Sequence, residues 1–308
     1  MAILGNAVKG TVKDQESGNV LSMGQLSQIQ RVLLMVLDDV DEICRSNQLR
    51  YVLIGGTAIG CVRHKGFIPW DDDIDIAMPR ADYETFRTII ERDYAEKYSM
   101  TDAMRRNNFG KLIPKLRLKN TVYRTALEFD PSDREITCDV FIIENVPNNA
   151  LLRGFHGVLC MAMGFFVSCR RVAEYRGCLA RFGTGAGFQA KVILGTLLRF
   201  ASLETWANWT ERCYALCRDD DSQRITVPTD RRHYFGEIFP REIMCEMTDA
   251  AYEDRTFLIP KAYDYYLTER YGAYMEVPPK EKQVLSKYSM LDFGPYRDLA
   301  LGEEKTEM

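Results

Sequence analysis

The chain begins with an amphipathic pattern. From residue 26 to residue 43, apolar side chains recur at steps of three and four, which predicts a helix with one buried face. Its apolar positions are Leu26, Ile29, Leu33, Val36, Val40 and Ile43. A second helix is predicted to start at Ala81 or Asp82, with Tyr83, Phe86, Ile89 and Ile90 on its apolar face.

Strand patterns lie between and after these helices. Residues 51–54 are a short apolar run that ends at a Gly-Gly pair, after which Thr57 is predicted to cap a short helix. Residues 136–143, ITCDVFII, are rich in β-branched and aromatic residues, as strands are. Residues 151–218 predict helices, and a weak strand signal returns near Arg224.

The acidic run WDDDIDI at residues 70–76 is the strongest chemical signal. In a strand, Asp73 and Asp75 point the same way, roughly 7 Å apart along the backbone. Such carboxylates repel each other unless a cation lies between them. Hard oxygen ligands suit Mg²⁺, which completes its shell with substrate phosphates. The run predicts a Mg²⁺ site for a phosphorylated substrate, and the alternative is a solvated acidic turn.

Two further features join this run. Gly55 and Gly56 at the start of a helix let phosphate oxygens approach the backbone. Asp139 is a costly residue in an apolar strand unless it is paired with a metal or acts as a base. A carboxylate there can complete the metal site or take a proton from an attacking hydroxyl.

Basic residues near these elements are candidates for neutralising a diphosphate. Arg63 and Lys65 lie between the Gly-Gly pair and the acidic run. Lys115 and Arg117 share one face of the alternating stretch 112–118. The alternative for all four is an ordinary solvated surface.

The composition is that of an ordinary globular chain: 308 residues, 46% hydrophobic, with a net charge of −4, which does not suggest nucleic acid as a partner. Nine cysteines, an odd number at scattered spacings, and the absence of a secretory pattern predict free thiols in the cytoplasm. The longest uncharged apolar run, residues 157–169, is too short to predict a spanning helix.

Charge is unevenly distributed. Residues 151–203 carry seven Arg and Lys residues against one acid, Glu174. This segment has three interpretations: contact with an anionic membrane, binding of a polyanionic or lipid-linked acceptor, or a structural insert.

Four blocks of the chain resemble the LicD family of phosphocholine transferases. They are GGTAIGCVRHKGFIPWDDDIDIAMPRADYETF at 55–86, KLRLKNT at 115–121, CDVFIIENVP at 138–147 and IPKAYDYYLTERYGAYMEVPP at 259–279. The Gly-Gly turn, the Asp-x-Asp pair and the distant third Asp are also the pattern of the DNA polymerase β superfamily. The resemblance implies an α/β (α+β) nucleotidyltransferase fold, with a mixed sheet core, flanking helices and a helical insert.

The family resemblance also implies domain limits and a chemistry. We expect a flexible arm at 1–23, a catalytic core at 24–147, a basic helical insert at 148–225, a return to the core at 226–295 and a polar tail at 296–308. The implied enzyme transfers phosphocholine from CDP-choline, releasing CMP, to a hydroxyl of a cell-surface glycan or a lipid-linked precursor. Its expected location is the cytoplasm, and contact with the inner face of the membrane is left open.

Residue roles follow from the matched motifs. The resemblance implies that Asp73, Asp75 and Asp139 hold one or two Mg²⁺ or Mn²⁺ ions. We expect Asp139 to be the base and Arg63 or Lys65 to neutralise the leaving CMP. The phosphate-facing turn is Gly55, Gly56 and Thr57.

The sequence leaves alternatives to this activity open. The donor could carry ribitol phosphate, as in the related fukutin-related proteins, because the family's histidine after the C-terminal Pro-Pro is missing here. The chain could instead move a nucleoside monophosphate, or be a non-catalytic glycan- or membrane-binding module.

Several single residues have two interpretations. Asp71 and Asp72 are further metal ligands or turn caps, and His64 and Trp70 are substrate contacts or packing residues. The tyrosines that could form a cation–π cage or simply pack on the core are Tyr263, Tyr265, Tyr266, Tyr271 and Tyr274.

Overall fold

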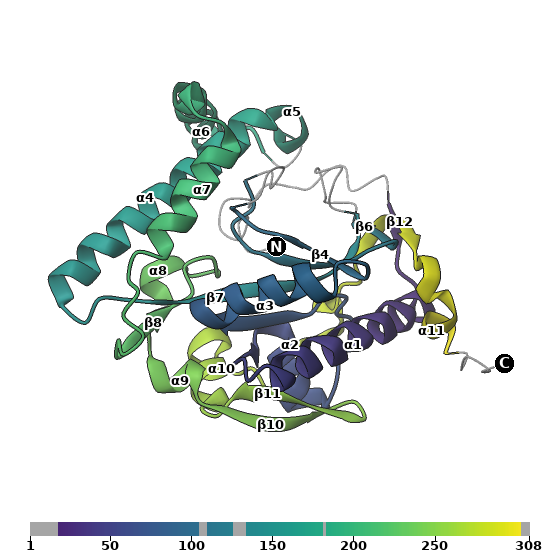
Figure 1. Cartoon of the computed structure of the whole chain (residues 1–308). Coiled ribbons are helices and arrows are strands. Elements are labelled where there is room, and N and C mark those ends of the chain that lie inside the picture. Colours follow the sequence, from purple (N-terminus) through teal and green to yellow (C-terminus); the bar gives the residue numbers. More distant parts are fainter. Residues whose placement is uncertain (1–17, 105–109, 126–133, 181–182, 303–308) are drawn as a thin grey trace. The chain divides into compact units, whose positions relative to one another are not determined.

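A computed structural model describes residues 18–104, 110–125, 134–180 and 183–302 (Figure 1). They divide into two compact units, each considered by itself. The core unit comprises the described residues of Ser17–Met100, Lys115–Phe141 and Pro240–Met308. The helical unit comprises those of Thr101–Pro114 and Ile142–Phe239.

The two predicted amphipathic helices of the core unit are confirmed. Helix α1 spans Met23–Ser46 and buries every apolar position that the pattern selects. It starts before the apolar stripe because Ser22 and Gln25 form a capping box that satisfies its first backbone N–H groups. Helix α3 spans Arg80–Asp93 and buries the four predicted positions, directly after Pro79 ends a strand.

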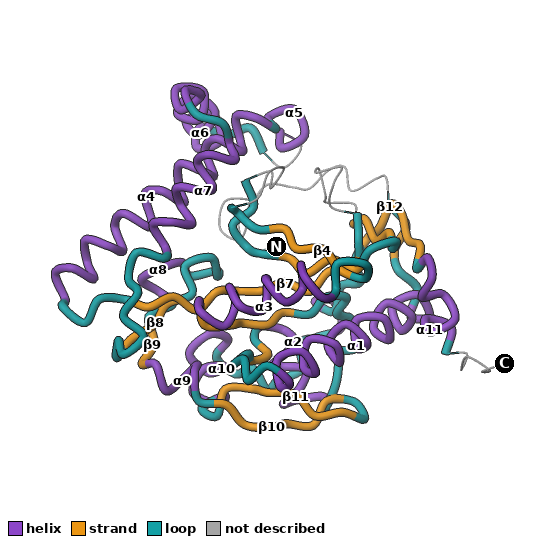
Figure 2. The backbone as a smooth tube through the Cα atoms, in the orientation of Figure 1, coloured by secondary structure: helices purple, strands orange, loops and turns teal. Residues whose placement is uncertain are grey.

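A mixed sheet forms the centre of the core unit (Figure 2). Its strand order is β2 (Val52–Leu53), β3 (Asp75–Pro79), β7 (Ile136–Asn145), β5 (Lys115–Leu118) and β4 (Tyr98–Thr101). Strands β5 and β7 are antiparallel, with Lys115 opposite Asp139. The buried side chains Ile74, Ile76 and Met78 anchor the acidic run to this sheet, as predicted.

Smaller elements complete the core unit. A three-stranded antiparallel sheet joins β1 (Asn19–Val20), β12 (Lys287–Asp292) and β6 (Val122–Thr125), and β10 (Met247–Tyr252) and β11 (Arg255–Pro260) form a hairpin. The short helical elements are α2 (Gly55–Ile59), π-helical η1 (Gly60–His64), α9 (Arg241–Cys245), α10 (Tyr263–Tyr271), η4 (Lys280–Lys282), η5 (Gly294–Tyr296) and α11 (Arg297–Leu301).

The helical unit confirms the helices predicted for residues 151–218. They are α4 (Ala150–Glu174), α5 (Arg176–Leu179), α6 (Ala186–Leu197), η3 (Leu198–Phe200) and α7 (Leu203–Tyr214). Strand β8 (Arg224–Thr226) pairs with the end of β7, and α8 (His233–Gly236) and β9 (Phe239–Pro240) follow. By length and composition alone α4 could cross a membrane, and only 22% of its most apolar window is buried.

Two local predictions differ from the structure. Thr57 does not cap a helix: α2 begins at Gly55, and the Thr57 hydroxyl accepts a hydrogen bond from Asp75 N instead. The acidic strand begins at Asp75, so Asp71 and Asp73 lie in the segment before it rather than in step along it. Both differences arise because contacts with neighbouring elements, which no local pattern encodes, fix this region.

The mixed α/β architecture is confirmed, while the domain limits stay predictions. Residues 1–17 of the expected arm and 303–308 of the expected tail lie outside the described residues. Of the remainder, Asn19–Val20 pair with β12 and Arg297–Leu301 form α11.

The capping box gives the first prediction. Ser22→Ala removes the side-chain acceptor for Gln25 N, so we expect the free energy of unfolding to fall by about 1 kcal/mol. Ser22→Thr keeps the hydroxyl and should lose much less. Urea unfolding of the three proteins tests this, and equal losses in both variants would contradict the capping role.

Candidate active site

The turn from β2 into α2 is built around Gly55, whose φ of +59° disfavours any side chain. A Cβ at Gly55 would lie 2.9 Å from Asp75 Oδ2, and one at Gly56 would lie 2.6 Å from Asp71 Oδ2. The two glycines therefore leave the room that two carboxylates take against the backbone. The predicted approach of substrate phosphates to this turn stays a prediction.

Three elements hold this turn against the acidic segment. Asp75 N donates to the buried Thr57 hydroxyl at 2.9 Å, and Ile54 N donates to Asp75 O at 3.1 Å. Gly55 N donates at 3.3 Å to the hydroxyl of Tyr266, a buried side chain of α10. Hydrogen bonds shielded from water in this way are costly to lose, so β3, α2 and α10 fix where Asp75 lies.

Asp71 and Asp73 form a coupled pair of acids. Gln30 of α1 fixes the Asp71 backbone by donating to its carbonyl at 2.9 Å. A hydrogen bond joins the two carboxyl groups; burial first, and then repulsion from Asp73, raises the pKa of Asp71. Burial also raises the pKa of Asp73, with repulsion from Asp72 and Asp139 added. Two acids held together in this way share a proton.

Asp139 joins this group from the neighbouring strand. Its backbone N–H donates to Ile74 O at 3.0 Å, which ties β7 to the acidic segment. Its carboxylate is 3.0 Å from Lys115 Nζ, and its charge acts on Asp73. The structure therefore brings Asp139 together with the Asp-x-Asp pair and with one of the four predicted cations.

The donor set fits a hard cation. Asp71, Asp73, Asp75 and Asp139 offer only oxygen atoms, the donors that Mg²⁺ prefers. Among the residues that the structure describes, no three acidic, His or Cys side chains already stand in a metal-binding arrangement. The Lys115 ion pair offsets part of the repulsion, and the raised pKa values favour the protonated forms of Asp71 and Asp73; a bound ion would compete with both. The metal roles stay predictions.

Sequence reasoning missed two residues that position Asp72. Its carboxylate accepts hydrogen bonds from the hydroxyl of Tyr123 on β6 and, at 2.8 Å, from that of Ser286. Asp72 is thus engaged by the three-stranded-sheet region, while Asp71 and Asp75 face the glycines. Nothing in the local sequence of Tyr123 or Ser286 marks this role.

The structure places Arg63 away from the carboxylates. Its Nη1 donates to the backbone carbonyls of Tyr274 and Glu276 at 2.6 and 3.0 Å, and its Nε donates to His64 Nε2 at 2.9 Å. Trp70 meets the His64 ring edge-on at 6.0 Å. These contacts show Arg63 joining η1 to the segment after α10, and its predicted role on substrate stays a prediction.

Two other predicted cations also have structural partners. Lys65 has a left-handed backbone, and its carbonyl accepts a hydrogen bond from Glu253 N at 2.6 Å. Arg117 is buried and pairs with Glu135 at 3.5 Å. Lys115 pairs with a carboxylate of the cluster, its Nζ lying 3.0 Å from Asp139.

The tyrosines of 263–274 do not converge on one point. Tyr266 and Tyr274 are buried, whereas Tyr265 and Tyr271 are exposed. Tyr266 supports the Gly55 turn, and the Tyr274 hydroxyl donates to Asp264 at 2.7 Å. This arrangement favours packing over a cation–π cage.

A family model matches the part of the chain that carries the candidate site. The model of the LicD/FKTN/FKRP nucleotidyltransferase domain matches residues 48–144, a range that contains the Gly-Gly turn, the acidic run and Asp139. Together with the similarity of most of the chain to a LicD protein, this match supports a LicD-family phosphotransferase.

Three curated proteins are similar in sequence to this chain. The chain is 28% identical to the lipopolysaccharide cholinephosphotransferase LicD of Haemophilus influenzae, over 84% of this chain and 94% of that protein. Shorter matches are to uncharacterized proteins of Rickettsia typhi, 38% identical over 19% of both chains, and of Rickettsia prowazekii, 40% identical over 16% of this chain and 19% of that one. The similarity to the first relative extends well beyond residues 48–144.

The carboxylate cluster predicts a thermal response to Mg²⁺. At a concentration about tenfold above Kd, the ion should stabilise the wild type by about 1.4 kcal/mol, which raises Tm by a few degrees. In Asp73→Asn we expect the response to disappear, because a central oxygen donor and its charge are lost. Thermal scans with and without Mg²⁺ measure this.

Asp93→Asn is the matched control for that experiment. Asp93 pairs with Arg92 on the surface of α3, so its loss should leave the Mg²⁺ response unchanged. A full response in Asp73→Asn would show that the ion binds elsewhere.

Proposed function

We propose that this protein transfers phosphocholine from CDP-choline to a hydroxyl of a cell-surface glycan or its lipid-linked precursor, releases CMP and depends on Mg²⁺. The observation that carries the proposal is the packing of Asp75 and Asp71 on the Gly55-Gly56 turn, with Asp73 beside Asp71 and the charge of Asp139 acting on Asp73. The relative that transfers phosphocholine to lipopolysaccharide supports the choice of group and of acceptor class.

Asp73, Asp75 and Asp139 would hold the ion. When bound, Mg²⁺ supplies positive charge that neutralises the donor diphosphate and the charge developing on the departing CMP. The chain supplies the positions: Thr57 and Tyr266 fix the turn, and Gln30 fixes the backbone of Asp71. Lys115, 3.0 Å from Asp139, brings a positive charge to the edge of the cluster.

The transfer itself needs one proton acceptor. The acceptor hydroxyl attacks the phosphorus that carries choline, its proton passes to Asp139, and the bond from that phosphorus to CMP breaks. Phosphoryl transfer of this kind depends mainly on positioning and electrostatics. That requirement suits a site of fixed carboxylates. The two cysteines of the matched motifs, Cys61 and Cys138, are buried, and burial raises the pKa of each thiol, which disfavours a nucleophilic thiolate.

The donor is tested by calorimetric titration. We expect CDP-choline to bind the wild type only with Mg²⁺, and Asp75→Asn to lose that binding because one oxygen donor is gone. If the protein prefers CDP-ribitol, the transferred group is ribitol phosphate instead of phosphocholine. Tight binding of a nucleoside triphosphate, with neither CDP compound bound, would make the protein a nucleotidyltransferase and contradict the proposal.

The base is tested by rates. With CDP-choline and lipopolysaccharide free of phosphocholine, Asp139→Asn should lower kcat for CMP release by about 10²–10⁴-fold, the usual contribution of a general base. Asp254→Asn, at an exposed acid beside Arg255, should keep the wild-type rate. Full activity in Asp139→Asn would remove Asp139 from the mechanism.

A further inference from the structure

We propose that the helical unit binds the surface of an anionic lipid bilayer through one apolar face of α4, with the helix lying along the surface rather than crossing it. This face is defined by Leu151, Leu152, Phe155, Val158, Met161 and Phe165. The inference concerns binding and does not depend on the transfer chemistry proposed above.

The side chains of this face are exposed to an unusual degree. Leu151 is 85% exposed, Phe155 73% and Val158 63%. Single exposed apolar residues are common, but a contiguous group of them marks a surface that binds a partner or a membrane. The group follows helical spacing, because steps of three, four and seven return to one side of a helix.

A second helix continues the same surface. Cys169 lies five full helical turns after Leu151 and so faces the same side of α4. There α6 packs on it so closely that a Cβ on Gly195 would meet Cys169 O. Helix α6 and η3 carry three further exposed apolar side chains: Ile193 is 64% exposed, Leu197 71% and Phe200 74%. Figure 1 shows α6 at the far end of α4 from Ala150.

The charges around this surface select the lipid. Glu174 is the one acid between residues 150 and 203, and buried Arg170 pairs with it at 3.1 Å. Glu174 is itself exposed, whereas the other exposed charged residues described in this range, Arg176 and Arg199, are basic. Lys191 lies 5.8 Å from the centre of the Phe165 ring and donates to Ser168. A positive charge at the border of an apolar face is the arrangement that binds anionic lipid surfaces.

The opposite side of α4 packs against other elements of the helical unit. His156 Nε2 lies 2.8 Å from Cys213 O on α7, and its Nδ1 lies 3.0 Å from the Tyr234 hydroxyl. Cys160 packs with Tyr214 and Tyr234 in the same buried cluster. A spanning helix would have to leave these partners and carry buried Arg170 into lipid, which is costly. The length of α4 therefore does not make it a transmembrane helix.

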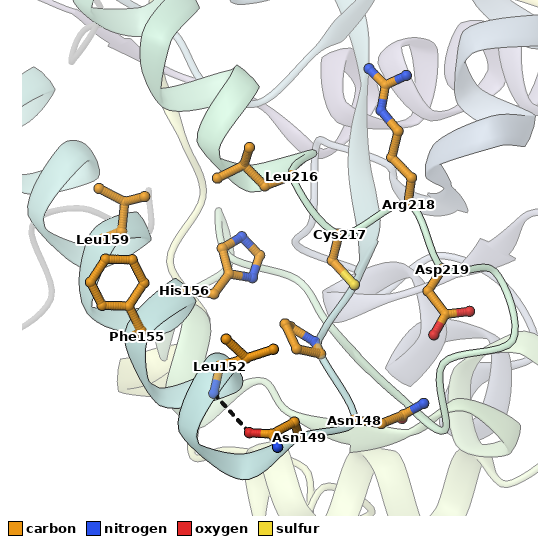
Figure 3. A pocket seen from close by; sticks show the side chains of 11 residues that line it. Asn148, Asn149, Leu152, Phe155, His156, Leu159, Leu216, Cys217, Arg218 and Asp219 are labelled. Carbon is orange, nitrogen blue, oxygen red and sulfur yellow. Dashed lines mark hydrogen bonds between the residues drawn. The ribbon is translucent and has the colours of Figure 1, made fainter.

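A pocket on the flank of this face extends the apolar surface (Figure 3). Its volume is about 520 Å³, and it lies between the start of α4 and the residues after α7. Leu152 and Phe155 belong to both the face and the pocket, while Leu159 and Leu216 line it further. Exposed Arg218 and Asp219 also line the pocket, so its charged groups are mixed and its apolar wall is the part that suits lipid. The pocket thus offers apolar wall to a lipid chain at the edge of the bilayer.

Vesicle sedimentation tests the proposal. The wild type should bind vesicles of phosphatidylcholine mixed with phosphatidylglycerol, and should bind less at high salt and to phosphatidylcholine alone. The variant Leu151→Gln, Phe155→Gln, Val158→Gln should lower the partition coefficient at least about tenfold, because three side chains no longer enter the bilayer. Glutamine keeps the helix, and circular dichroism checks the fold.

A matched variant guards against a general effect of removing apolar residues. Val20→Gln, Val277→Gln, Val284→Gln changes three valines of the core unit that are 56%, 55% and 71% exposed, and should bind as the wild type does. Equal binding by the α4 variant, or no binding by the wild type, would overturn the proposal. Wild type that stays in the membrane after a carbonate wash would span the bilayer, which would also overturn the proposal. The same holds if the wild type is a dimer that does not bind vesicles and the α4 variant is a monomer, because the face would then bind a second copy of the chain.

Discussion

Electrostatic repulsion among four carboxylates is the constraint on which the candidate active site depends. Asp71, Asp73, Asp75 and Asp139 come from a segment before a strand and from two strands. Asp71 and Asp75 meet the glycine turn, while Asp73 interacts with Asp71 and Asp139. Without a cation, such a group stays together only if some of its charge is offset. Lys115 offsets the charge of Asp139, and the raised pKa values of Asp71 and Asp73 favour their protonated forms.

The surrounding fold prevents the carboxylates from moving apart. Helix α1 contributes Gln30 and α10 contributes Tyr266, while Tyr123 and Ser286 hold Asp72. These residues are far apart in sequence. Gln30, Tyr123 and Ser286 fix parts of the segment 71–75, and Tyr266 fixes the glycine turn beside it. All four are uncharged, so these contacts do not neutralise the negative charge of the segment. The arrangement also explains why both glycines are needed, since any side chain there would strike a carboxylate.

The helical unit follows a different physical principle. Its core side carries hydrogen bonds and aromatic packing around His156 and Tyr234, whereas its outer side leaves large apolar groups in water. A helix with one committed side and one open apolar side is a surface element. The apolar content of α4 therefore reflects two uses: one side stabilises the unit and the other remains available for binding.

Short-range pattern alone determined the helices α1 and α3, strand β7 and the importance of Gly55, Gly56 and the acidic run, because burial periodicity and costly local charge are written in consecutive residues. Tertiary structure decided the rest. Only packing shows that Thr57 serves Asp75 rather than a helix end, and that Arg63 serves the carbonyls of Tyr274 and Glu276. The partners of Arg63 lie more than two hundred residues away and leave no periodic signal, so a sequence can name the charged groups but not their partners.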